Sequence, residues 1–94
     1  MIRVLGKQYT LLIVGLLGNE GELGFNAIAR AVGNPRANLL SQRLRELEDV
    51  GLLTRRVAQQ RPVRVAYSLT DMGMQLRKLL IPLFEWLESV QKVA

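Results

Sequence analysis

Apolar residues recur at helical spacing through most of the chain and at strand spacing in one part of it. Residues 7–17 are apolar nearly all round, which predicts a first helix that is buried on more than one side. After a polar turn, Leu23 is expected to contribute a very short strand. Residues 25–32 carry apolar side chains on one helical face and are followed by Gly33, so a second helix is predicted to end there.

A third helix is predicted from the start signal that follows at once. Asn34 is expected to be its N-cap and Pro35 to lie in its first turn, and the helix should run to about Val50. Because so little chain separates it from the second helix, the two are predicted to form a helix-turn-helix over about residues 25–50. Its apolar stripe, which should face the core, consists of Ala37, Leu40, Leu44 and Leu47.

The polar face of this third helix changes character along its length. Its amino-terminal half presents amide, hydroxyl and guanidinium groups, and the carboxylates of Glu46, Glu48 and Asp49 come only in the last turns. A recognition helix reads DNA bases mainly with its N-terminal residues, where carboxylates would be repelled by phosphates. The amides are expected to read bases and the arginines to contact guanine or phosphate. The candidate DNA-binding residues of this helix are Arg36, Asn38, Ser41, Gln42, Arg43 and Arg45.

Strand spacing begins after Gly51. Residues 52–57 predict one strand, residues 58–62 a polar tip, and residues 63–69 a second strand in which apolar and polar side chains alternate. This period of two is typical of a half-buried hairpin, and the hairpin over about residues 52–69 is interpreted as a wing. Its arginines are candidates for contacts with the DNA backbone or minor groove, and they are Arg55, Arg56, Arg61 and Arg64.

A long last helix is predicted over about residues 70–91, with Thr70 as its N-cap. Pro82 is expected to kink this helix rather than end it, because apolar spacing resumes beyond the proline. The apolar residues span a sector wider than the ~100° that one packing face requires. On a small domain this width favours a dimer interface, and the alternative is that the stripe wraps the protein's own core. The expected interface residues are Leu79, Leu83, Trp86, Leu87 and Val90.

Composition indicates one folded domain spanning residues 1–94, because 49 % of the residues are hydrophobic and 22 % are charged. The net charge is +5, and all of it comes from positions 30–64, where eight arginines accompany three acidic residues. Arginine suits bidentate contacts with phosphate and guanine. A solvated face remains the alternative, but concentration of the charge in one segment favours a nucleic-acid footprint.

Histidine and cysteine are both absent, which removes the commonest general base, thiol chemistry and the commonest metal ligands. No enzyme activity, metal or cofactor is therefore expected. The longest apolar run, residues 10–17, is too short for the ~18–20 residues of a membrane span. It is interpreted as a buried helix in a cytoplasmic protein without a membrane partner.

Several segments together resemble the HxlR-type transcriptional regulators, small prokaryotic winged-helix proteins of the broad MarR-like group. The resemblance rests on "FNAIARAV", "LLSQRLRELEDVGLLTRRV", "RVAYSLTDMG" and "LLIPLFEWL", and covers nearly the whole chain. It implies a nucleoid-associated homodimer paired through its first and last helices, with Leu12 and Leu16 joining the interface. It also implies a pseudo-palindromic operator with half-site centres ~34 Å apart. Many relatives have "GKW" where this chain has "GKQY", and a thiol-sensing cysteine that this chain lacks.

The fold expected from these patterns is mostly α with a small β-hairpin, a winged helix-turn-helix. The expected function is sequence-specific binding of double-stranded DNA by a homodimeric transcriptional regulator. The alternative is a winged helix that serves as a protein-protein interaction module without DNA binding. The basic middle segment counts against this alternative, because the cores of protein interfaces are depleted in charge. The sequence does not indicate a small-molecule effector.

Overall fold

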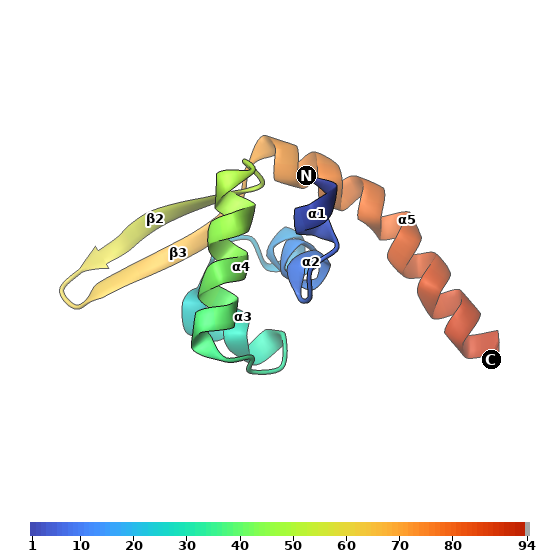
Figure 1. Ribbon diagram of the computed structural model, residues 1–94, viewed down its shortest axis with the longest axis horizontal. Helices are drawn as coiled ribbons and strands as arrows, with labels where there is room; N and C mark the ends of the chain where they lie inside the picture. The colour runs from blue at the N-terminus through green and yellow to red at the C-terminus, as the bar shows by residue number, and fades with distance from the viewer. Residues whose placement is uncertain (94) are drawn as a thin grey trace.

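A computed structural model describes the backbone of residues 1–93 and the side chains of residues 1–91. Five helices and three strands make a mostly helical fold with one small sheet, as the sequence predicts (Figure 1). In chain order the elements are α1 Ile2–Leu5, α2 Thr10–Glu20, β1 Leu23–Gly24, α3 Phe25–Ala31, α4 Ala37–Asp49, β2 Leu53–Gln60, β3 Val63–Leu69 and α5 Asp71–Val93. Among the described helices, none is long and apolar enough to cross a membrane.

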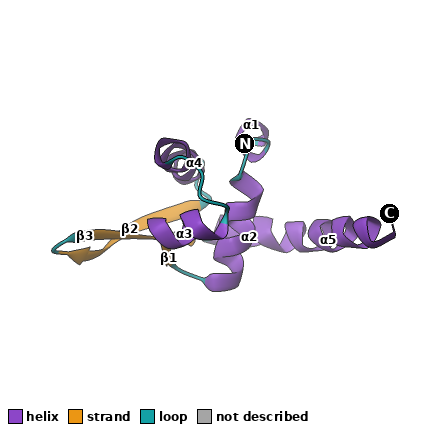
Figure 2. Ribbon diagram, turned by 90° about the horizontal axis from the view of Figure 1, so that it is seen from below, coloured by secondary structure: helices purple, strands orange, loops and turns teal. Residues whose placement is uncertain are grey.

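The sheet is antiparallel, with strand order β1-β3-β2. The short β1 pairs Leu23 with Tyr67 and so joins the start of α3 to the base of the hairpin. Beyond β1, strands β2 and β3 continue alone as the wing, which projects from the helices opposite to the end of α5 (Figure 2). A register shift between Val57 and Gln59 marks a bulge in β2, and bulges increase local twist.

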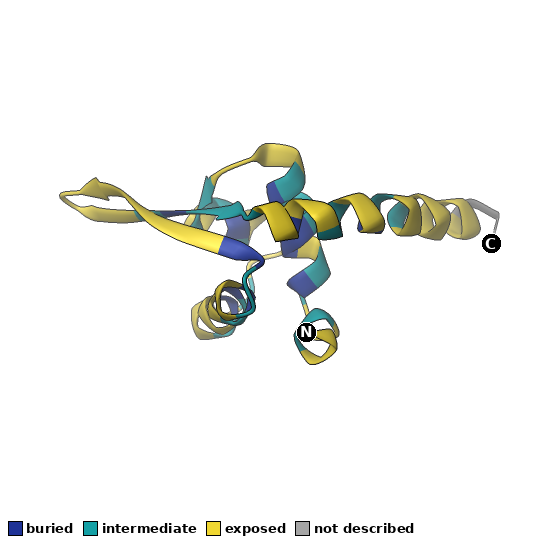
Figure 3. Cartoon of the chain, turned by 90° about the horizontal axis from the view of Figure 1, so that it is seen from above, coloured by how far each residue is buried: buried dark blue, intermediate teal, exposed yellow. Residues whose placement is uncertain are grey.

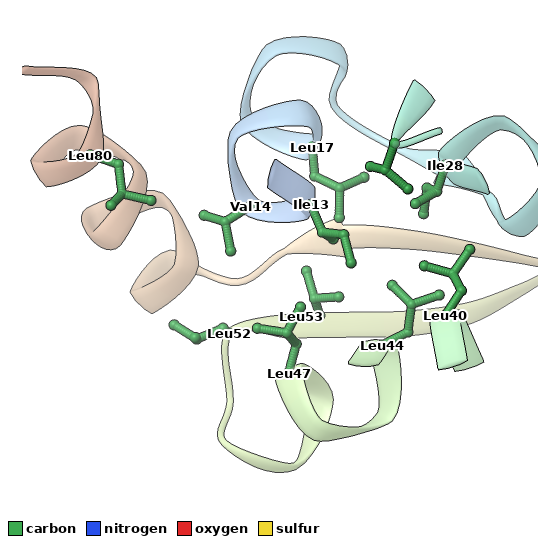
Figure 4. Close-up of a cluster of buried hydrophobic side chains, with 11 residues drawn as sticks. Ile13, Val14, Leu17, Ile28, Leu40, Leu44, Leu47, Leu52, Leu53 and Leu80 are labelled. Atoms are coloured by element: carbon green, nitrogen blue, oxygen red, sulfur yellow. The ribbon is translucent and has the colours of Figure 1, made fainter. Parts of the chain in front are cut away.

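The core forms where α2, α3, α4 and the start of the sheet converge (Figure 4). Full burial of an aliphatic side chain stabilises the fold by about 1.5–3 kcal/mol, so this cluster holds the helix-turn-helix against α2. Among the described residues of α5, Leu80 alone is a buried member of the cluster, and Leu76 and Phe84 pack against it. The labelled members are Ile13, Val14, Leu17, Ile28, Leu40, Leu44, Leu47, Leu52, Leu53 and Leu80.

The amino-terminal helix differs from the prediction over residues 7–17. It begins at Thr10, continues to Glu20, and is preceded by the separate short helix α1. Tyr9, at the N-cap of α2, has a left-handed backbone with φ of 72°, which divides the two helices. The predicted burial on more than one side holds for Ile13, Val14 and Leu17, whereas Leu12 is exposed.

The prediction that Asn34 caps the third helix is wrong. Gly33 and Asn34 both have left-handed backbones, and their N–H groups donate to the carbonyl oxygens of Arg30 and Ala29. This pattern is a Schellman motif. Asn34 therefore closes α3, and α4 begins at Ala37 without a side-chain cap. Ala37 is exposed rather than part of the core stripe, because the buried stripe begins one turn later at Leu40.

The other boundaries lie close to the prediction. The wing tip is narrower than expected, because β2 continues to Gln60. Thr70 caps α5 as predicted: its Oγ1 accepts a hydrogen bond from the Gly73 N–H at 3.1 Å and donates to the Gly51 carbonyl oxygen at 2.6 Å. Helix α5 continues through Pro82 to Val93, so the proline does not end it.

Candidate nucleic-acid interface

The exposed face of α4 carries most of the predicted base-reading residues. Leu40, Leu44 and Leu47 are buried beneath the helix, and the opposite side faces solvent (Figure 3). This face needs no rearrangement of the core to become accessible. The predicted residues that lie exposed on it, or at the N-cap beside it, are Arg36, Asn38, Ser41, Gln42 and Arg45.

Arg43, unlike the other predicted residues of this helix, is not exposed. Its side chain is only 13 % exposed, and its guanidinium donates from Nε to the Gln8 carbonyl oxygen at 3.0 Å and from Nη1 to Glu46 Oε1 at 3.1 Å. The structure thus places Arg43 on the flank that faces the segment between α1 and α2. We therefore leave Arg43 out of the DNA-reading set.

The acidic end of α4 is partly neutralised by the same segment. Glu46 Oε2 lies 2.8 Å from Lys7 Nζ, in addition to its contact with Arg43. The contact with Lys7 is the main reason that the pKa of Glu46 lies below its usual range; the positive charge of Arg43 acts in the same direction, and burial opposes both. Glu46 is thus held as a paired carboxylate on the flank of the helix, whereas Glu48 and Asp49 remain exposed.

Arginines of the wing fall into two groups. Arg55, Arg61 and Arg64 are exposed. Arg56 instead forms a two-pronged ion pair with Glu22, with Nε 2.6 Å from Oε2 and Nη2 2.5 Å from Oε1. This hydrogen-bonded pairing lowers the pKa of Glu22 and raises that of Arg56. Arg56 therefore already has an anionic partner in the free protein.

A polar hollow of about 380 Å³ lies between α4 and the wing. Arg45 of α4 and Arg55 of β2 both line this hollow. The sequence alone does not predict that these two residues are neighbours. Tyr67, which is half-buried against the core, also lines the hollow, because the register pairs it with Arg55 across the hairpin. Ser41 and Glu48 complete the lining. The hollow thus connects the helix face and the wing into one surface with two arginines, two hydroxyl groups and one carboxylate.

Apolar side chains are exposed along α5 and at Leu12 of α2, and together they are called the apolar face. Leu79 is 76 % exposed, Trp86 59 % and Leu12 57 %. Among the described apolar side chains of α5 only Leu80 is buried, so the alternative that this stripe merely wraps the protein's own core does not account for its exposed members. The end of α5 extends beyond the body of the protein (Figure 3). The other predicted interface residues are Leu83, Leu87 and Val90, which are exposed, and Leu16, which is half-buried.

Comparisons with known proteins agree with this arrangement. The model of the HxlR-like helix-turn-helix family matches residues 4–93. An uncharacterized HTH-type transcriptional regulator, YvaP of Bacillus subtilis, is 40 % identical over 85 residues, which make up 90 % of this chain and 78 % of the relative.

Two solved structures extend the similarity to the fold. A crystal structure described as a possible HxlR family transcriptional factor from Thermoplasma volcanium has a TM-score of 0.85 and 35 % identity, covering 97 % of this chain and 81 % of that one. The redox regulator HypR in its reduced form has a TM-score of 0.88 and 32 % identity, covering 98 % and 90 %.

Proposed function

Because this chain belongs to the HxlR-like helix-turn-helix family, we propose that it binds double-stranded DNA sequence-specifically, as a homodimer on a pseudo-palindromic operator. The family membership makes it a helix-turn-helix transcriptional regulator and not an enzyme. The expectations of a winged helix-turn-helix fold and of a non-enzymatic function are thereby confirmed. The operator and the dimer are our proposals.

The observation that carries the proposal is the exposed face of α4. Its amino-terminal half presents Asn38, Ser41 and Gln42 and contains no acidic residue, because the carboxylates of the helix come only in its last turns, and the helix is held from beneath by buried leucines. Asn and Gln amides pair bidentately with adenine in the major groove. Arg36 and Arg45 are placed beside these groups for guanine or phosphate contacts.

The wing supplies contacts to the DNA backbone in the proposed complex. Arg55, Arg61 and Arg64 are exposed and offer guanidinium groups without a competing partner on the described side chains. Such contacts set the register of the protein on DNA and carry little sequence information. In the proposed complex, α4 therefore contacts the bases and the wing contacts the phosphates.

The exposed apolar face supports the homodimer. Side chains such as Leu79 and Trp86 leave large apolar areas in water, and covering apolar surface is favourable by about 25 cal/mol per Å². A stable interface covers about 800 Å² on each partner. A two-fold dimer through α2 and α5 covers this face on both chains and presents two recognition helices to successive major grooves, ~34 Å apart.

The proposal is tested with fluorescence anisotropy of labelled duplex DNA. Random-sequence duplex is titrated at several salt concentrations, and the operator is then selected from a random pool. We expect binding to random DNA in the micromolar range or weaker, with log K falling linearly against log salt. Selected DNA should bind at least ~10³-fold more tightly and contain inverted half-sites.

Absence of binding even at ~50 mM salt, where phosphate contacts are strong, would refute DNA recognition. The alternative, a winged helix that binds another protein, would then account for the exposed face of α4. Binding to random DNA without any selected sequence would refute the assignment of Asn38 and Gln42 as base readers.

A further inference from the structure

The segment between α1 and α2 is fastened to the flank of the recognition helix by a small polar cluster. The cluster consists of the Gln8 carbonyl oxygen, the Arg43 guanidinium, the Glu46 carboxylate and the Lys7 ammonium. We call it the linker clamp. Arg43 and Glu46 have side chains that are 13 % and 17 % exposed, and Lys7 is 41 % exposed. The cluster is thus shielded on the α4 side and open on the Lys7 side.

The linker clamp joins parts of the chain that are far apart in sequence. Arg43 bonds to a backbone carbonyl 35 positions earlier. Among the described side chains, no other side chain of α4 forms a hydrogen bond or ion pair with another element. The remaining attachments of α4 are the apolar contact of its buried leucines with the core and, at its C-terminal end, the hydrogen bonds from the Leu52 N–H to the Leu47 carbonyl oxygen and from Thr70 Oγ1 to the Gly51 carbonyl oxygen. Apolar contact is not directional, so away from that end the clamp supplies a directional restraint on this helix.

The other side of the clamp leads directly into the proposed dimer face. Lys7 and Gln8 precede Tyr9, whose left-handed backbone begins α2. Helix α2 in turn carries Leu12, which is exposed and belongs to the proposed interface. A restraint between the linker and α4 is therefore a restraint between the dimerising segment and the recognition helix.

We propose that Lys7, Arg43 and Glu46 are positioning residues that fix the orientation of α4 relative to α2. This inference rests on the proposed function, because it sets how far apart a homodimer holds its two recognition helices. Helix α4 has 13 residues and is therefore about 20 Å long, so a small rotation at the clamp moves the Asn38 end appreciably. The clamp thereby selects the half-site spacing that the dimer accepts.

Spin-label distances test the clamp without DNA. The chain has no cysteine, so Glu20→Cys and Asp49→Cys place labels at the ends of α2 and α4. Labelled protein is mixed with an excess of unlabelled protein, so that pulsed electron paramagnetic resonance measures the distance within one chain. We expect a narrow distance distribution in the otherwise unaltered protein and a broader one in Lys7→Glu. Lys7→Arg keeps a positive charge opposite Glu46, leaves the contact between Arg43 and Glu46 in place and should keep the narrow distribution.

Duplexes with variable half-site spacing provide the functional readout. We expect Lys7→Glu and Glu46→Lys to reduce the preference for the best spacing over its neighbours by roughly threefold or more. Lys7→Arg should keep the preference. Glu20→Lys changes an exposed residue of α2 outside the clamp by the same charge as Glu46→Lys and serves as the matched control. Melting temperatures identify any variant that fails to fold. If one single variant fails, the other is compared with the unmodified protein and with the control.

An unchanged distance distribution in Lys7→Glu would overturn the clamp. So would an equal broadening in Lys7→Arg, because the charge pair would then not be its cause. Failure of the unmodified protein to bind any DNA, with the distance results as expected, would refute the proposed function and leave the clamp as a restraint on α4.

Discussion

Replacing Trp86 by alanine should dissociate the homodimer. Trp86 is 59 % exposed in the single chain. A tryptophan buries about 150–250 Å², so roughly 90–150 Å² remains for a partner to cover, worth about 2–4 kcal/mol per copy at ~25 cal/mol per Å². A two-fold dimer contains the residue twice. A partner covers only part of this area, and alanine keeps some of it, so we take half of the summed stabilisation of the two copies. The expected loss of binding free energy is then about 2–4 kcal/mol, which raises the dissociation constant about thirtyfold to a thousandfold.

The assay is sedimentation equilibrium of the unmodified protein and of Trp86→Ala over a wide concentration range. Val63→Ala is the matched control, because Val63 is 67 % exposed but lies on the wing. Trp86 is the only tryptophan, so its fluorescence in the unmodified protein reports burial directly and should shift to shorter wavelength as the dimer forms. Equal dissociation constants for Trp86→Ala and the unmodified protein, or emission independent of concentration, would refute the assignment of this face.

Three further outcomes follow from the contacts described above. Gln42→Ala should lower the preference for operator over random DNA by about 1–3 kcal/mol, whereas Arg61→Ala should weaken both about equally; anisotropy titrations would contradict this if Gln42→Ala weakened both alike. Gly73→Ala should lower stability by about 1–3 kcal/mol in urea denaturation, although alanine favours helices, because its Cβ would overlap the Leu52 carbonyl oxygen. The pKa of Glu46 is lowered from 4.5 in the folded protein, so its ionised form stabilises the fold above that pH and the stabilisation is lost as the pH falls below it. The urea midpoint should therefore fall more steeply below pH 4.5 in the unmodified protein than in Glu46→Gln, and parallel curves would contradict this.

The helix-turn-helix and the wing were predictable because their signals are local. The apolar spacing of α4 reports which side of the helix is buried, and the core confirms it. The alternation in β3 predicts the strand but not its buried side, because Ala66 is buried and Val63 is exposed. The short helix α1 has only four residues, fewer than periodicity needs. Asn34 carries a correct turn signal, but a residue that closes one helix with its backbone cannot also cap the next. That competition is visible only in three dimensions.

The chemistry of the candidate site was predictable only where it depends on one element. A helical wheel places Asn38 and Gln42 on the outer face, and both are exposed. The wheel also places Arg43 on a flank, but its partner is the carbonyl of Gln8, and a backbone carbonyl leaves no mark in the sequence. Whether the stripe of α5 is exposed likewise depends on how much of it α2 covers, which spacing alone cannot decide.

The ion pair between Glu22 and Arg56 covers one edge of a wing guanidinium with a carboxylate. Nε and Nη2 are both engaged by Glu22, so in the proposed complex a DNA phosphate reaches this edge of Arg56 only by displacing Glu22. The displaced carboxylate then lies near the DNA as a like charge that repels it. In the proposed complex the pair is therefore a competitor within the protein that weakens indiscriminate adhesion to nucleic acid, whereas Arg55, Arg61 and Arg64 are exposed and form no ion pair on the described side chains.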